Sequence, residues 1–157
     1  MEKEISSVGI DSPVGRLRIW ANNAQIERVT WECGPSLGAD HPKLLHDAAS
    51  QMEAYFNATL TAFDLPLALG RGQFQVGFQL ALLKIPHGET RTYGELAAEL
   101  GASAQAIGQA CGANRLPIIV PCHRVLGATN LGGYSGAGGV EAKVSLLRHE
   151  GAAGLLI

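Results

Sequence analysis

The chain has 157 residues, of which 46% are apolar and 17% charged, enough for one ordinary domain or two small ones with a hydrophobic core. Its formal net charge is −2, which argues against a generally basic nucleic-acid-binding surface, although a local basic face is compatible with it. No apolar run approaches the roughly 20 residues of a membrane-spanning helix and the charged N-terminus lacks an apolar signal segment, so we expect a cytoplasmic protein without membrane association. Three cysteines without Cys-x-x-Cys spacing favour neither a disulfide framework nor a zinc site.

The N-terminal part is typical of a small α/β unit. Residues 15–20 and 26–31 are short β-prone runs, and Asn22 lies in the turn-forming pair between them, which predicts a β-hairpin. Apolar side chains recur at helical spacing over residues 43–58. We therefore expect a helix that packs on the hairpin.

A glycine-containing stretch divides the chain. Residues 69–72 follow an extended segment and are the best candidate for a linker. This boundary gives an α/β domain over 1–69 and a second domain over 70–157. The second domain begins with a helix predicted over 73–85. Its inward side chains are expected to be Phe74, Phe78, Ala81, Leu82 and Ile85.

Two short helices with a glycine turn between them are predicted next. Thr92 and Glu95 have capping-box spacing, so a helix begins here, and Gly101 suits the turn that follows it. Ser103 can cap a second helix that runs to about Ala113. In a DNA-binding helix-turn-helix this second helix enters the groove, but many helix pairs without a DNA role share the pattern.

A glycine-rich loop and a final helix end the chain. The composition of residues 127–139 requires sharp bends or close approach to another group. Tyr134 and Ser135 make this loop a candidate substrate wall, although an ordinary surface loop would show the same composition. The last helix is predicted over 140–150. Its inward side chains are expected to be Val140, Val144 and Leu147.

The segment from Asn114 to Val125 is the strongest candidate for chemistry. An apolar run ends at a proline, and Cys122 follows directly with His123 and Arg124 behind it. Positive charge next to a thiol favours the thiolate, which is the nucleophile. A free cysteine also packs as a small buried hydrophobe, so the local sequence alone leaves a structural role open.

The motifs of the second half occur together in one known family. They are Ile-Pro-His-Gly-Glu-Thr at 85–90, Thr-Tyr-Gly-Glu-Leu-Ala at 92–97, the whole of 114–125, Gly-Tyr-Ser-Gly at 133–136 and Leu-Leu-Arg-His-Glu-Gly at 146–151. Over about residues 63–157 the chain closely resembles the O6-alkylguanine-DNA alkyltransferases (methylated-DNA–protein-cysteine methyltransferases), and Pro121-Cys122-His123-Arg124-Val125 is the most specific block. The resemblance implies an RNase-H-like α/β N-terminal domain followed by a mainly α C-terminal domain that contains the helix-turn-helix.

The resemblance implies a reaction that consumes the protein. An alkyl group on guanine O6 is transferred to Cys122 in one displacement, each molecule reacts once, and no metal or other cofactor takes part. His123 would take the thiol proton through a bridging water, and Glu150 would hold the histidine in the right tautomer. Asn114 would shape the loop of the cysteine. Tyr93 would press on the phosphate of the target nucleotide and donate to the departing base.

The resemblance also implies a partner, double-stranded DNA that contains O6-alkylguanine, with O4-alkylthymine as a further candidate lesion and the protein acting as a monomer. The damaged base would leave the stack, because a buried thiol cannot reach the alkyl carbon of a stacked base. The residues expected to contact DNA or the base are Gln105, Ala106, Gly108, Arg115, Arg124, Val125, Tyr134 and Ser135.

One position departs from the family pattern. The family usually has Ala-Arg-Ala-Val-Gly in the recognition helix, and its arginine enters the duplex; here residues 104–108 are Ala-Gln-Ala-Ile-Gly, so Gln105 stands at the arginine position. Glutamine is uncharged and shorter, and Arg115 is the only charged residue between Leu100 and Cys122. We therefore expect an alkyltransferase with weakened base flipping. The alternative is a degenerate member that senses alkylation damage and repairs little.

Overall fold

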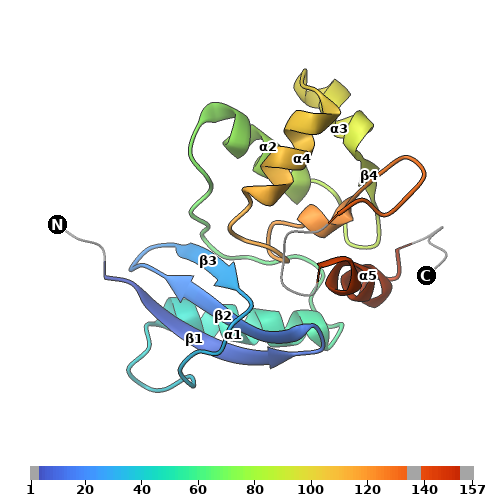
Figure 1. The fold of residues 1–157 in the computed structure, drawn as a ribbon. Helices are drawn as coiled ribbons and strands as arrows, with labels where there is room; N and C mark the ends of the chain where they lie inside the picture. The colour runs from blue at the N-terminus through green and yellow to red at the C-terminus, as the bar shows by residue number, and fades with distance from the viewer. Residues whose placement is uncertain (1–3, 134–138, 153–157) are drawn as a thin grey trace. The chain divides into compact units, whose positions relative to one another are not determined.

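The computed structural model describes residues 4–133 and 139–152. It divides into two compact units, Met1–Ala68 and Leu69–Ile157. Figure 1 shows a sheet and a helix in the first unit and mainly helices in the second. This arrangement confirms the predicted fold class, an α/β N-terminal part followed by a mainly helical C-terminal part.

The sheet of the first unit is antiparallel, in the order β1-β2-β3. Its strands are β1 Ser6–Ser12, β2 Gly15–Ala21 and β3 Ile26–Thr30. β1 pairs with β2 along its whole length, with Val8 opposite Ile19. The predicted hairpin is present as β2 and β3, whereas the sequence does not predict β1, because three serines, a glycine and an aspartate make its β-propensity low.

One helix, α1 Lys43–Phe56, packs on the sheet and contacts all three strands. The alternating side chains of β2 and one face of α1 form the core of this unit. Eight core residues of this unit have no solvent exposure: Val8, Ala21 and the six with larger side chains, Leu17, Ile19, Ile26, Leu45, Met52 and Tyr55. Full burial of a side chain of this size contributes roughly 1.5–3 kcal/mol, so the predicted helix-on-hairpin packing is the main stabilising contact of the first unit.

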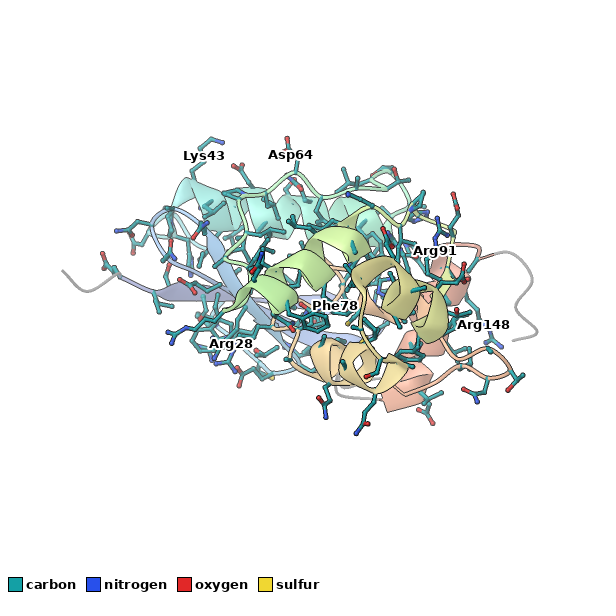
Figure 2. All side chains as sticks on the ribbon, turned by 90° about the horizontal axis from the view of Figure 1, so that it is seen from above. Arg28, Lys43, Asp64, Phe78, Arg91 and Arg148 are labelled. Atoms are coloured by element: carbon teal, nitrogen blue, oxygen red, sulfur yellow. The ribbon has the colours of Figure 1, made fainter. Side chains whose placement is uncertain are left out.

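The second unit is built from four helices and a short parallel strand pair within the described residues. The helices are α2 Gln73–Leu83, α3 Tyr93–Leu100, α4 Ala104–Gly112 and α5 Gly139–His149. α2 contacts α3 and α4, and the fully buried Phe78 belongs to the α2 side of this core (Figure 2). No helix of the described ranges is long and apolar enough to cross a bilayer.

The strand pair fixes the position of the cysteine segment. A 3-10 turn, η1 Cys122–Arg124, leads into β5 Val125–Leu126, which pairs in parallel with β4 Arg91–Thr92. Because α3 begins at Tyr93, directly after β4, this pairing brings the cysteine segment next to the start of the helix-turn-helix.

The predicted caps of the helix-turn-helix are confirmed. The Thr92 side chain accepts a hydrogen bond from the Glu95 N–H at 3.0 Å, and the Glu95 carboxylate accepts one from the Thr92 N–H at 3.0 Å. Gly101 ends α3 with φ 64°, a left-handed conformation that glycine adopts without strain. Ser103 caps α4 by accepting from the Ala106 N–H at 3.1 Å.

Two predicted helix faces need correction. Phe74 is 42% and Val140 is 44% exposed, although both were expected to point inward. The buried face of α5 consists of Ala142, Lys143, Leu146 and Leu147. The sequence places the face wrongly because it assumes that a lysine points to solvent, whereas Lys143 is buried with hydrogen-bond partners.

Candidate active site

Cys122 is mounted on a turn whose backbone is fixed at several points. The Val120 N–H donates to the Leu116 carbonyl at 2.8 Å, and the Cys122 N–H donates to the Val120 carbonyl at 2.8 Å. Ile118 has φ 73°, an uncommon conformation for a β-branched residue. Such strain persists only where the surroundings determine the backbone. The thiol group is carried on this turn by a residue that is 4% exposed.

Asn114 closes this turn with hydrogen bonds from its side chain. Its amide nitrogen donates to the Val120 carbonyl at 3.0 Å, and its Oδ1 accepts from the Leu116 N–H at 3.1 Å. The same Oδ1 also accepts a hydrogen bond, at 3.1 Å, from Nε2 of Gln79 on α2. The residue is buried, so these bonds are protected from competition with water.

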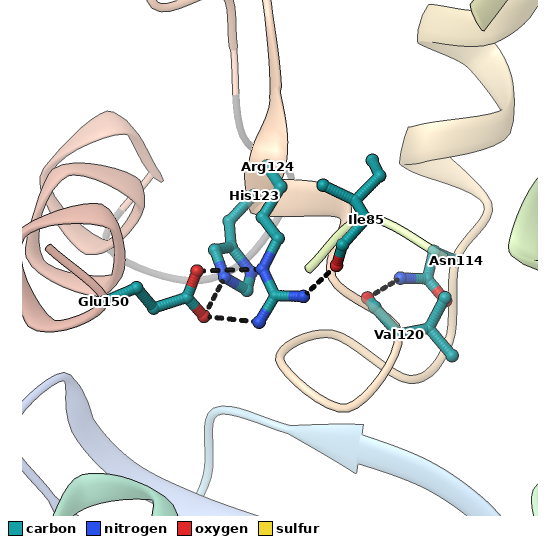
Figure 3. Close-up of polar contacts among 6 residues, drawn as sticks. All are labelled: Ile85, Asn114, Val120, His123, Arg124 and Glu150. Atoms are coloured by element: carbon teal, nitrogen blue, oxygen red, sulfur yellow. Dashed lines mark hydrogen bonds and ion pairs between the residues drawn. The ribbon is translucent and has the colours of Figure 1, made fainter. Parts of the chain in front are cut away.

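His123 and Arg124, which directly follow Cys122, form a buried hydrogen-bond network with Glu150. Glu150 Oε2 lies 2.8 Å from His123 Nε2, and the Arg124 guanidinium donates to both carboxylate oxygens, from Nε at 2.8 Å and from Nη2 at 2.9 Å (Figure 3). Arg124 Nη1 donates to the Ile85 carbonyl at 2.6 Å. Arg124 is therefore buried and bonded within the protein, and its charge is directed at Glu150.

The network determines which nitrogen of His123 is basic. Burial alone would raise the pKa of Glu150, but the hydrogen bonds from His123 and Arg124 outweigh it and hold that pKa well below its usual range. Burial lowers the pKa of His123, so the imidazole is neutral near pH 7. A carboxylate can only accept, so His123 Nε2 carries the proton and Nδ1 carries the lone pair. Nδ1 is buried and has no hydrogen-bond partner within the described ranges, which leaves it available as a base.

Lys143 is a site residue that the sequence does not reveal. Its side chain has no solvent exposure, and its ammonium donates to the Val125 carbonyl at 2.6 Å and to the Gly133 carbonyl at 3.0 Å. Burial lowers its pKa. The ammonium lies 5.8 Å from the centre of the Tyr93 ring, which links α5 to the first residue of α3. A lysine in an amphipathic helix gives no sequence signal for burial.

Tyr93 faces this lysine at the rim of the site. Burial raises the pKa of its phenol, which keeps the hydroxyl protonated and able to donate. Gly132, with φ 70°, passes close to Tyr93: a Cβ at this position would lie 2.8 Å from both Cε2 and the hydroxyl oxygen of Tyr93. Glycine is needed here for both the backbone angle and the close approach.

Cys111 differs from Cys122 in its surroundings. Burial, with a further contribution from the nearby Cys122, raises the pKa of the Cys111 thiol to about 12. It therefore stays a thiol near neutral pH and is a poor nucleophile. Cys33 is exposed and lies in the other unit, so Cys122 is the cysteine that the site geometry favours.

The residues predicted to contact DNA differ in their solvent exposure. Gln105 and Gly108 are exposed on α4, Ala106 is half-buried and Arg115 is exposed. Val125 is buried, with its carbonyl held by Lys143. The predicted wall residues, Tyr134 and Ser135, lie outside the described residues.

Two family models match successive parts of the chain. The ribonuclease-like domain of 6-O-methylguanine DNA methyltransferase matches residues 9–69, and the DNA binding domain of the same enzyme matches residues 73–152.

Known proteins match over nearly the full length. A methylated-DNA–protein-cysteine methyltransferase of Mycobacterium bovis is 42% identical over 149 residues, which are 90% of this chain and 89% of the relative. One from Methanosarcina acetivorans is 38% identical over 150 residues, or 90% and 95%. The crystal structure of Mycobacterium tuberculosis O6-methylguanine methyltransferase has a TM-score of 0.82 at 38% identity and covers 98% of this chain and 97% of that chain. The M. tuberculosis OGT in complex with DNA has a TM-score of 0.79 at 41% identity and covers 92% of each.

Proposed function

The chain belongs to the 6-O-methylguanine DNA methyltransferase family, and from this premise we propose that it repairs DNA by transferring the alkyl group of O6-alkylguanine to its own Cys122. The observation that carries the proposal is the buried hydrogen bond between His123, the residue after the cysteine, and Glu150. A nucleophile, a base and a group that orients the base are the parts that activate a thiol.

The reaction is a single displacement at the alkyl carbon. His123 Nδ1 takes the Cys122 proton through a bridging water, and the sulfur then attacks the carbon that is bonded to guanine O6. The C–S bond forms as the C–O6 bond breaks, and the electron pair of the broken bond remains with guanine. Tyr93 donates a proton to the departing base. The product is a thioether, which has no leaving group that water can displace under these conditions, so each molecule reacts once and needs no cofactor.

The Glu150 carboxylate has two partners in this proposal, His123 and Arg124. Oε2 holds the Nε2–H tautomer of His123, which keeps the lone pair on the reacting side. The Arg124 guanidinium neutralises the carboxylate and fixes its position. Arg124 is therefore assigned to the support of the base, and its contribution to DNA binding is indirect.

DNA binding is assigned to the 70–157 domain, with α4 as the recognition helix and the protein acting as a monomer. Because Cys122 is 4% exposed, the damaged nucleotide must rotate out of the stack to reach it. The N-terminus of α4 offers backbone N–H groups to phosphates. Val125, Tyr134 and Ser135 would line the pocket for the base.

Gln105 is expected to weaken this engagement. It is exposed in the first turn of α4, and an uncharged side chain there cannot pair with phosphates or replace the flipped base as an arginine does. This position favours a second candidate function, a sensor that binds alkylated DNA and transfers little. The Cys122–His123–Glu150 arrangement favours repair.

Transfer of a labelled methyl group tests the proposal. We expect label from duplex DNA containing O6-methylguanine to enter the protein in a one-to-one ratio, and Cys122→Ala to abolish this uptake. Cys33→Ala is the matched control, because Cys33 is exposed and in the other unit. Binding of the damaged duplex without label uptake would instead support the sensor.

A further inference from the structure

Gln79 is a buried polar side chain that the reaction described above does not use. It lies on α2 and is 1% exposed, although an amide is costly to bury without hydrogen bonds. Its Oε1 accepts from the Gly70 N–H at 2.7 Å, and its Nε2 donates to Asn114 Oδ1 at 3.1 Å. Both polar atoms of the side chain are therefore bonded, and the second leads to the cysteine turn.

The direction of each bond along this path is fixed. A backbone N–H can only donate, so the Gly70 N–H orients the Gln79 amide with its oxygen toward the linker and its nitrogen toward Asn114. Asn114 must then turn its own oxygen toward Gln79, which aims its nitrogen at the Val120 carbonyl, 3.0 Å away. That carbonyl also accepts from the Cys122 N–H at 2.8 Å.

The turn that receives this path is strained. Ile118 has φ 73°, which costs energy unless neighbouring bonds hold the backbone. Asn114 Oδ1 is held by two donors, the Leu116 N–H and Gln79 Nε2. Of these two donors, only Gln79 lies outside the cysteine turn, so its hydrogen bond anchors the turn to helix α2.

We propose that Gln79 is a positioning residue for alkyl transfer, acting through Asn114 to hold the turn that presents Cys122. The inference rests on the proposed function, because it concerns the rate of that transfer. It assigns Gln79 no contact with DNA or with the reacting atoms.

The test compares two glutamines of the same helix. Gln79→Met keeps the length of the side chain and removes both hydrogen bonds. Gln75→Met is the matched control, because Gln75 Nε2 donates to the Ala110 carbonyl at 3.1 Å and not to Asn114. We expect Gln79→Met to slow single-turnover transfer at saturating duplex by about tenfold, as for loss of one or two buried hydrogen bonds. The duplex concentration that gives the half-maximal rate should not change, and Gln75→Met should transfer at the wild-type rate.

A double-mutant cycle separates positioning from general destabilisation. Asn114→Ala should slow transfer by itself, and Gln79→Met should then add little. Gln79→Glu provides a second variant if Gln79→Met folds poorly: it keeps an acceptor for the Gly70 N–H but sets an oxygen against Asn114 Oδ1, and it should also slow transfer.

The outcomes are distinct. Equal rates for the Gln79 variants and the Gln75 control, or multiplicative effects of Gln79→Met and Asn114→Ala, would overturn the inference and leave the proposed function intact. A wild-type protein that takes up no methyl group would overturn the proposed function itself.

Discussion

Replacing Glu150 by glutamine tests whether the carboxylate sets the base. The wild-type side chain is fully buried and accepts three hydrogen bonds, one from His123 and two from Arg124. Glutamine has nearly the same shape, but one oxygen becomes an NH2 group. If that group takes the place of Oε2, it favours the opposite tautomer of His123 and also meets Arg124 Nη2; if it takes the place of Oε1, it meets Arg124 Nε. In either orientation two donors meet and the guanidinium loses its counter-charge.

The magnitude follows from these contacts. A buried cation that loses its partner costs about 3–5 kcal/mol, and a protein of this size loses roughly 2–4 °C in Tm for each kcal/mol. We therefore expect a fall in Tm of about 6–20 °C. Loss of the correct tautomer of a general base slows the chemical step by roughly 10²–10⁴-fold.

The assay is single-turnover methyl transfer at saturating duplex, at a temperature at which the variant is folded by circular dichroism. Glu141→Gln is the matched control, because Glu141 is an exposed carboxylate on α5, and it should change neither rate nor Tm. If Glu150→Gln transferred within twofold of the wild-type rate, the assignment of His123 and Glu150 as base and orienter would be refuted.

Three further predictions concern DNA engagement, the close approach of Gly132 to Tyr93, and acid stability. Gln105→Arg should raise duplex affinity and transfer rate by roughly tenfold, whereas Gln109→Arg, one turn further along α4, should give only the smaller effect of a general positive charge; equal gains in a binding titration would count against a specific role of position 105. Gly132→Ala should lower stability by about 1–2 kcal/mol and slow transfer by displacing Tyr93, while Gly133→Ala, where a Cβ meets nothing within 4 Å, should do neither in thermal melts and rate measurements. Burial lowers the pKa of His123 in the folded protein, so the unfolded chain takes up a proton before the folded protein does as pH falls below about 6.5. The lowered pKa of Glu150 removes further stability below its unfolded pKa of about 4.3. Tm measured from pH 8 to 4 should therefore fall on acidification, and a Tm that rises would contradict the lowered pKa of both groups.

Features set by neighbouring residues could be predicted from the sequence. The capping box of Thr92 and Glu95, the left-handed Gly101 and the Ser103 cap each depend on residues within one turn, and all are present. The pairing of β5 with β4 could not be found this way, because the two strands have two residues each and lie far apart in the sequence.

The prediction of burial from the sequence failed mainly at polar residues. Lys143 and Gln79 look like solvent-facing positions of amphipathic helices, and they are buried because their partners come from distant segments, the Val125 and Gly133 carbonyls for the first and Gly70 and Asn114 for the second. For the same reason the sequence does not show the role of Arg124, whose guanidinium donates two hydrogen bonds to Glu150, 26 residues further along the chain. A single sequence records residue types but not these long-range hydrogen bonds.

Mass spectrometry of the protein after exposure to alkylated duplex shows whether Cys122 is the alkyl acceptor. One methyl group per molecule, located on the peptide that contains Cys122 and absent after exposure to undamaged duplex, is the predicted result. An unchanged mass with bound damaged DNA, or a methyl group on Cys111 or Cys33, would contradict the account.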